Sequence, residues 1–394
     1  MDLKLSLVIG LVLLYFVMAS RPEGKKNFYY LTILMLVVRE LNVPLLGDVT
    51  PTSITATILF LGSWGKLKSY LSKWSAYIFM LIFSLILAVD NVEPYSKAAM
   101  WGFNLFVVCE LAVVTPVYIK TEEDMQKMIK YLMITCFIFS FTTLLGYWGY
   151  ADGVVIFNGF DESMVTSDIY HASRIYGISN SNLVQVISVI SIILIPKLQI
   201  RRKWLEWLII GVFVMSALVT LKRMSFIAMV AAMLYYVRSE RQLKHTSTIF
   251  VAAIIFVVLV MQFWEPISYR FGIAGFGGGE IEDHSTESRF YRIGFAIQAF
   301  KASPLIGMGS GYVTYVHNGF MEILGNCGIL GILLIFCKYI PNLKIVRKLE
   351  PWACAILLYL VTCFSLESAI NSTQMLGFLG IFHGGYIANK QLSN

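Results

Sequence analysis

Positively charged side chains that interrupt or flank apolar sequence are the first candidates for chemistry, because charge beside hydrocarbon is costly. Arginine is suited to binding phosphate, since its planar guanidinium donates paired hydrogen bonds and stays charged. Imidazole titrates near neutral pH, so it can accept a proton from a reacting group. The residues of these types that stand beside apolar segments are Arg174, Lys222, Arg223, Arg289, Arg292 and His317. They are candidates for a site that acts on a phosphate-bearing substrate.

Each of these residues also has a simpler explanation. An arginine at a helix end can extend its side chain to the membrane interface without binding anything, and Arg270 and Lys301 are interpreted in this way. Arg292 can be part of a solvated helix face, and His317 can mark a water boundary. Residue types alone leave both interpretations open.

The composition predicts which elements must position these side chains. The chain has 394 residues, of which 57% are hydrophobic and 14% charged, and its mean hydropathy is +0.71. A soluble domain has about 25% charged residues. Apolar runs recur along the whole length, so the sequence predicts an all-α, polytopic membrane protein with a single transmembrane domain over residues 1–394.

About twelve or thirteen transmembrane helices are expected. The apolar segments are 3–20, 28–46, 53–64, 76–89, 98–119, 131–150, 182–196, 205–221, 224–237, 247–264, 318–340, 352–366 and 374–387. Several are shorter than the roughly 20 residues usual for a span.

Lysine and arginine predict the orientation of these spans. They recur in six connections that share one side if thirteen spans alternate: 21–26, 66–73, 120–130, 197–203, 238–244 and 338–348. The positive-inside rule assigns that side to the cytoplasm. The net charge of +7 is thereby explained by topology, and no nucleic-acid partner is expected.

The opposite side carries the two longest connections, 151–181 and 265–317. The second exceeds the roughly 12–15 residues beyond which a connection is usually functional or disordered. Its sequence predicts a short amphipathic helix that ends at Ser303-Pro304 and is followed by a glycine-rich turn. Four separate regions then present cations or imidazole at this outer face, which favours a functional site there.

Other patterns indicate little chemistry. Six cysteines lie in or beside apolar segments without a CxxC pair, so neither a disulfide framework nor a zinc site is expected. The acidic stretch Glu280–Glu287 lacks the spacing of a calcium loop and is interpreted as solvated. Walker A, HExxH and GxSxG motifs do not occur in the sequence. No metal or cofactor is therefore expected.

The stretch "SPLIGMGSGYVTYVHNGFMEILGNCGILG", residues 303–331, combines the outer loop with the start of a span. Gly325, Gly328 and Gly331 follow one another at three-residue steps. They predict close helix packing, with Cys327 buried beside them.

This stretch resembles the family of bacterial O-antigen polymerases and O-antigen ligases, in which a helix-opening His-Asn follows a Pro-Leu-x-Gly-x-Gly turn. "SRIYGISNSN" (173–182), "TLKRMS" (220–225) and "ESRFYRIGFAI" (287–297) resemble further parts of the family pattern. The resemblance covers about residues 170–340. It implies a multi-helix, GT-C-like glycosyltransferase fold that uses undecaprenyl-pyrophosphate-linked saccharides at the periplasmic face of the inner membrane.

The resemblance also implies roles for individual residues. His317, Arg289 and Arg223 are the expected catalytic residues: the histidine as base and the arginines, with Arg174, as a pyrophosphate clamp in place of a metal. Asn318 and Glu322, one helical turn apart, can hold the imidazole or the acceptor sugar, although Glu322 can instead satisfy a buried polar contact. The residues expected to bind substrate are Arg174, Arg292, Asn318, Glu322 and Asn182.

Within this family the expected activity is O-antigen polymerisation, and a chain-length regulator in the membrane is an expected partner. A ligase that moves polymer to lipid A-core, or a capsule or exopolysaccharide polymerase, is the alternative. A lipid-linked oligosaccharide flippase is disfavoured, because a transporter would place paired charges near the middle of its spans.

Overall fold

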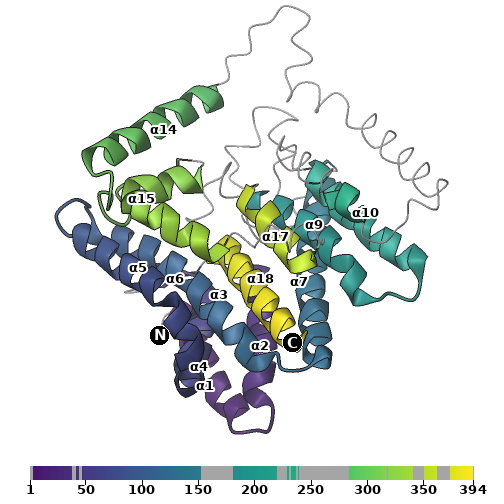
Figure 1. Ribbon diagram of the computed structural model, residues 1–394. Coiled ribbons are helices and arrows are strands. Elements are labelled where there is room, and N and C mark those ends of the chain that lie inside the picture. The colour runs from purple at the N-terminus through teal and green to yellow at the C-terminus, as the bar shows by residue number, and fades with distance from the viewer. Residues whose placement is uncertain are drawn as a thin grey trace, which may run out of the picture. The chain divides into compact units, whose positions relative to one another are not determined.

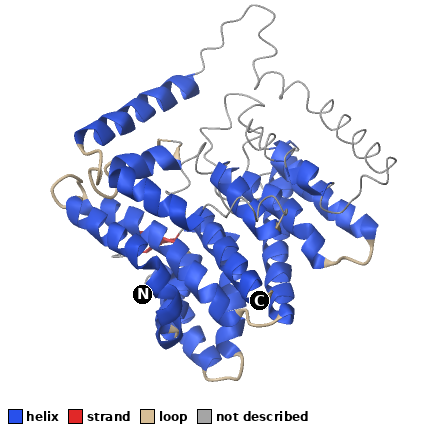
Figure 2. Ribbon diagram, viewed as in Figure 1, coloured by secondary structure: helices blue, strands red, loops and turns tan. Residues whose placement is uncertain are grey.

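The computed structural model describes residues 3–37, 41–43, 47–151, 181–219, 229, 232–236, 238, 284–316, 318–339, 350–361 and 373–393. Nearly all described elements are α-helices (Figure 2). The chain divides into two compact units, Met1–Thr135 with Ser288–Asn394, and Cys136–Glu287.

The first unit contains most of the described elements (Figure 1). They are α1 (Leu3–Ala19), α2 (Gly24–Leu34), η1 (Met35–Val37), β1 (Leu41–Val43), β2 (Gly47–Val49), α3 (Pro51–Gly62), α4 (Trp64–Leu71), η2 (Ser72–Trp74), α5 (Ser75–Leu87), α6 (Tyr95–Tyr118), α15 (Gly319–Tyr339), α17 (Pro351–Tyr359) and α18 (Thr373–Leu392). The second unit contains α9 (Ser181–Leu194), η4 (Ile195–Leu198) and α10 (Lys203–Val219). Helices α7 (Glu122–Ala151) and α14 (His284–Ala302) cross the boundary between the units.

Three described helical segments are long and apolar enough to cross a membrane: Trp64–Leu87, Tyr95–Tyr118 and Glu122–Leu145. Shorter apolar helices overlap four of the other predicted spans, at Val8–Ala19, Pro51–Gly62, Ile187–Leu198 and Gly319–Leu334. Most of 224–237 and all of 247–264 lie outside the described residues. The chain is therefore an α-helical membrane protein, as its composition predicted.

The prediction for the second span, 28–46, was wrong. Helix α2 ends at Leu34, the 3-10 turn η1 follows, and the chain then forms the antiparallel pair β1–β2, in which Leu41 lies opposite Val49. The stretch "NVPLLGDV" contains a proline and a glycine, which disfavour continuation of a helix. An apolar run was mistaken for a continuous helix.

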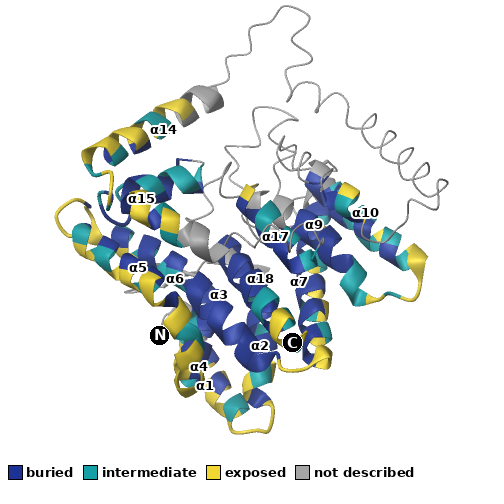
Figure 3. Ribbon diagram, viewed as in Figure 1, coloured by how far each residue is buried: buried dark blue, intermediate teal, exposed yellow. Residues whose placement is uncertain are grey.

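The core of the first unit lies where α6 packs against α18, and most residues of both helices are buried (Figure 3). Glycines on α18 allow the close approach. A Cβ at Gly380 would lie 2.9 Å from Leu111 Cβ, and one at Gly384 would lie 2.5 Å from Thr115 Cβ. This pair of helices is a rigid support for the elements around it.

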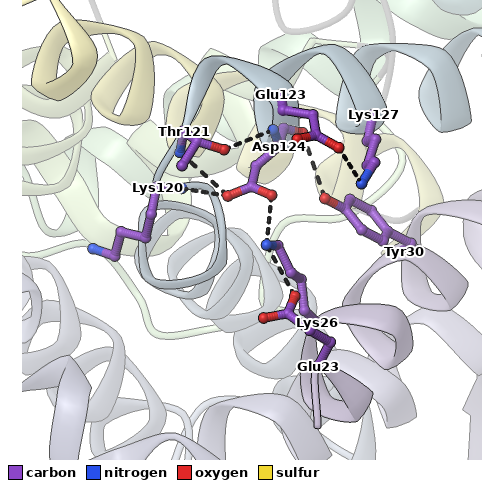
Figure 4. Close-up of polar contacts among 8 residues, drawn as sticks. All are labelled: Glu23, Lys26, Tyr30, Lys120, Thr121, Glu123, Asp124 and Lys127. Atoms are coloured by element: carbon purple, nitrogen blue, oxygen red, sulfur yellow. Dashed lines mark hydrogen bonds and ion pairs between the residues drawn. The ribbon is translucent and has the colours of Figure 1, made fainter.

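A polar cluster joins α2 to the beginning of α7 (Figure 4). Lys26 forms ion pairs with Glu23 and Asp124, and Asp124 also accepts hydrogen bonds from the backbone N–H groups of Lys120 and Thr121 at 3.2 Å. Burial opposes the charge on Lys26, but its hydrogen bonds to the two carboxylates outweigh that effect and raise the pKa of Lys26 to about 12. Burial likewise opposes ionisation of Asp124, but these hydrogen bonds hold the pKa of Asp124 below its ordinary value.

These contacts lie at one end of the first unit, where other connections between helices also make contact. Tyr70 on α4 contacts Lys120 after α6 and Gln391 at the end of α18. At the other end, Ser310 donates a backbone hydrogen bond to the carbonyl of Ser84 near the end of α5. Three of the six connections that the lysine and arginine pattern assigned to one side, 21–26, 66–73 and 120–130, therefore lie together, and the turn after α14 lies against the end of α5.

Candidate active site

The connection between α14 and α15 forms a tight, glycine-rich turn. Helix α14 ends at Ala302, directly before Ser303-Pro304, so the predicted helix end is confirmed. Gly307, Gly309 and Gly311 have φ angles of +72°, +101° and +77°, a region that residues with a Cβ rarely occupy. A Cβ at Gly309 would also lie 2.6 Å from the backbone nitrogen of Ala88. The spacing of glycines in the sequence is thus required by backbone conformation and by contact with α5.

The same turn is bonded to a break in α15. Gly328 has φ +63° and ψ −163°, which is not helical, so neighbouring carbonyl and N–H groups lose their helical partners. The carbonyls of Gly325 and Asn326 accept hydrogen bonds from Met308 and Gly309, at 2.9 and 3.0 Å. Conversely, the N–H groups of Ile329 and Leu330 donate to the carbonyls of Pro304 and Leu305, at 2.9 and 3.2 Å. Backbone groups that lack helical partners at the break are therefore hydrogen-bonded to the backbone of the turn.

The glycines of α15 were predicted to permit close packing, with Cys327 buried beside them. Cys327 is buried, and a Cβ at Gly325 would lie 2.5 Å from Val313 Cγ2. The nearest neighbour of Gly325 is therefore the loop residue Val313 rather than a residue of another helix. Gly328 has the further role of breaking the helix, which the spacing did not predict.

Asn326 is a residue that the sequence analysis missed. Its side chain is fully buried, and its amide pairs with both backbone groups of Val313: Oδ1 accepts from the N–H, and Nδ2 donates to the C=O, both at 2.8 Å. A single side chain thereby replaces a missing strand or helix partner for the loop. An amide within an apolar span is the signal that could have identified it.

The two residues next to position 317 are also held by side-chain contacts. The carboxylate of Glu322 is fully buried and accepts the backbone N–H of Val316 at 2.8 Å. Asn318 caps α15, because its Oδ1 accepts the N–H of Met321 at 3.0 Å. Of the two roles considered for Glu322, the described contact is the buried polar one. His317 lies outside the described residues.

A further contact comes from α14. The guanidinium Nη1 of Arg292 donates to the carbonyl of Tyr315 at 2.8 Å, and Tyr315 has a left-handed φ of +57°. Arg289 lies three residues earlier on the same helix, which places both arginines on neighbouring positions of one helix face. Arg292, Asn318 and Glu322 are therefore brought together around the chain that precedes and follows position 317.

The other predicted site residues are not placed by the structure. Arg174 and Arg223 lie outside the described residues, as does the side chain of Arg289. Asn182 is in the first turn of α9, and its side chain is likewise outside the described part. Their roles stay predictions.

Comparison with known families gives the decisive observation: residues 208–336 match the family model described as O-antigen ligase. This segment is therefore similar to the O-antigen ligase family. The family model covers Arg223, Arg289 and the whole turn from α14 into α15, so the resemblance seen in the sequence is confirmed. Arg174 and Asn182 precede the matched residues. No curated protein matches the chain.

The match to the O-antigen ligase family fits the geometry described above. The matched segment ends at Phe336, beyond the helix break at Gly328. The glycine-rich turn, the break and the start of α15 thus lie within one family segment, and they form one hydrogen-bonded structure.

Proposed function

We propose that this protein is a membrane glycosyltransferase that polymerises saccharide repeat units carried on undecaprenyl pyrophosphate, at the periplasmic face of the bacterial inner membrane. The observation that carries the proposal is the match to the O-antigen ligase family over the segment containing His317. The support of its neighbours by Glu322, Asn318 and Arg292 agrees with a residue that must be held in position.

The proposed reaction transfers a saccharide from one lipid carrier to another sugar. The bond between the anomeric carbon and the pyrophosphate oxygen breaks, and a bond forms from that carbon to the acceptor hydroxyl oxygen. His317 takes the hydroxyl proton, and undecaprenyl pyrophosphate leaves with the electron pair. Arg289, Arg223 and Arg174 stabilise the charge that develops on this leaving group.

In this proposal, Arg292 and Glu322 act on the backbone that carries the histidine. Arg292 fixes the carbonyl of Tyr315 and Glu322 fixes the N–H of Val316, so the two residues before position 317 are held by opposite charges. Asn318 fixes the first turn of the following helix. Fixing these groups in advance reduces the conformational entropy that the histidine would otherwise lose when the reaction reaches its transition state.

The reaction class is tested with the purified full-length protein. It is incubated with a synthetic undecaprenyl-pyrophosphate repeat unit alone, and then with the repeat unit and lipid A-core. A ladder of products in the first mixture shows a polymerase. Product only in the second mixture shows a ligase, which the description of the matched family favours as the alternative. Absence of transfer in both mixtures contradicts the proposal for these substrates.

Variants test the assigned residues. His317→Ala and Arg289→Ala should each abolish product formation while the protein still expresses and inserts. Arg223→Lys should also fail, because a point charge does not reproduce the paired hydrogen bonds of a guanidinium. The matched control is Lys301→Ala, which removes an exposed cation from the last turn of α14. Near-normal product from His317→Ala would exclude the histidine as base.

A chain-length regulator in the membrane is a proposed partner of the polymerase. Co-expression with such a regulator should narrow the distribution of product lengths without changing the linkage, since the bond is formed by the polymerase itself.

A further inference from the structure

An exposed apolar surface runs from the turn after α14 onto α15. Leu305 is 65% exposed, and its carbonyl accepts the N–H of Leu330, so the two residues are neighbours. Ile329, Leu330 and Leu333 are also exposed, all after the break at Gly328. In a membrane-spanning helix, exposed leucine and isoleucine are the residues expected to contact lipid. Leu305 extends that surface onto the turn.

Helix α5 shows how deep the turn lies. Exposed apolar residues follow one another along α5 and continue to Val89, which is 63% exposed. Gly309 lies against the backbone of Ala88, and Ser310 donates to the carbonyl of Ser84, one helical turn further into the span. The apolar exterior of α5 therefore reaches past the level of Gly309 and Ser310. This places the turn level with the last exposed apolar residues of α5.

Much of the backbone of the turn is hydrogen-bonded to other backbone groups. Irregular backbone is tolerated within a membrane only where its polar groups are satisfied by protein. The N–H groups of Gly307, Met308, Gly309, Ser310 and Tyr312 all donate to backbone carbonyls, and the carbonyls of Pro304 and Leu305 accept from α15. These groups do not need water.

Helix α14 adds aromatic side chains of the kind that favour membrane interfaces. Phe290 and Tyr291 are largely exposed, Tyr291 at 80%, and Phe295 is partly exposed where it stacks on Tyr312. The opposite face of the helix packs its Ala296 and Ala299 against Val313 and Val316 of the loop. Phenylalanine and tyrosine at the end of a lipid-facing surface are typical of the layer between hydrocarbon and headgroups.

We propose that residues 303–310 form a turn inserted into the leaflet beside the candidate active site, with the aromatic face of α14 in the headgroup layer above it. The occupant of this surface is the bilayer, because the surface continues from the exposed apolar side of α15 and much of the backbone of the turn is hydrogen-bonded to protein. Membrane insertion does not depend on the proposed reaction. If that reaction is correct, insertion places Arg292 at the depth of a lipid-borne pyrophosphate.

The test measures depth in the full-length protein reconstituted into vesicles of phosphatidylethanolamine and phosphatidylglycerol. An environment-sensitive fluorophore is attached to Leu305→Cys or Tyr291→Cys, and the parent chain labelled in parallel gives the background from native cysteines. Two quenchers are compared, aqueous iodide and lipids that carry a nitroxide on the acyl chain. The matched control is Asn91→Cys, at an exposed polar position in the connection between α5 and α6.

The expected result at position 305 is quenching by the nitroxide lipids, loss of iodide quenching and blue-shifted emission. Position 291 should respond to both quenchers, and position 91 to iodide more than to the lipids. Iodide quenching at position 305 equal to that at position 91 would overturn the proposal. Shielding of position 305 from both quenchers would also overturn it, since protein rather than lipid would then cover the turn. If Leu305→Cys does not fold, Tyr291→Cys decides, and shielding from the nitroxide lipids there contradicts insertion.

Discussion

Replacement of Asn326 by leucine should release the loop that precedes position 317 while the rest of the protein stays folded. Leucine is close to asparagine in shape but can neither donate nor accept a hydrogen bond. The N–H and C=O of Val313 would then lose their partner in a fully buried position. The backbone of α15 around its break at Gly328 is hydrogen-bonded to other parts of the turn, and the substitution leaves those bonds in place.

The magnitude follows from the two groups that lose a partner. Each buried backbone group left unsatisfied costs about 1–3 kcal/mol, so the local cost is about 2–6 kcal/mol. The lower figure corresponds to a roughly 30-fold increase in the population of the opened loop. Asn326→Asp should also weaken the loop, because it keeps the acceptor for the N–H of Val313 but removes the donor to the C=O.

Hydrogen–deuterium exchange of the detergent-solubilised protein measures this opening directly. Peptides covering residues 308–316 should exchange faster in Asn326→Leu, whereas peptides from the α6 core should be unchanged. The control is Asn27→Leu, an exposed position on α2 in the part of the first unit where Lys26 pairs with Asp124. Unchanged exchange of residues 308–316 in a folded Asn326→Leu protein would refute the conclusion that this amide holds the loop.

Two further predictions concern the turn and the polar cluster. Gly309→Ala should lower the melting temperature, because the added Cβ would collide with the backbone of Ala88 and the φ of +101° is unfavourable for alanine. The control is Gly294→Ala, a helical position with nothing within 4 Å, which should be neutral or stabilising by about 0.5–1 kcal/mol. Equal effects of the two substitutions would contradict the contact between Gly309 and Ala88. Because the pKa of Asp124 is lowered in the folded state, its pairing with Lys26 stabilises the protein at a pH above the ordinary aspartate pKa, and this stabilisation is lost as the pH falls through the folded pKa. The difference in stability between the native chain and Asp124→Asn should therefore be constant near neutral pH and shrink below about pH 4. A difference that persists in acid would assign the effect to packing instead.

The sequence was sufficient to predict the helical membrane fold and the turn after α14, because both depend on local signals. Apolar runs predict helices, and Ser303-Pro304 followed by glycines predicts a helix end and a turn. The second span was mispredicted because hydropathy alone does not show that the helix ends at Leu34 and that a strand pair follows. The break at Gly328 was missed because glycine at three-residue steps is equally typical of close helix packing.

The support around position 317 could not be predicted in detail, since it depends on contacts between residues whose partners are set by the fold. Glu322 and Asn318 were identified from their spacing, but whether they would face substrate or backbone follows only from the path of the loop. In the structure Glu322 accepts the N–H of Val316 and Asn318 accepts the N–H of Met321, on either side of position 317. Arg292, considered as a phosphate ligand or a solvated residue, donates to the carbonyl of Tyr315.

These three contacts change how mutations in this segment should be interpreted. Loss of activity in Arg292→Ala has two explanations: loss of a substrate contact, or release of the Tyr315 carbonyl and of the backbone beside it. Exchange measurements on residues 308–316 separate them, because a purely substrate-binding role leaves the loop protected, whereas a positioning role does not. The same logic applies to Glu322, whose Glu322→Gln variant keeps an acceptor for the N–H of Val316 but removes the negative charge. If that variant stays protected and loses activity, the charge itself is needed beyond its bond to the backbone.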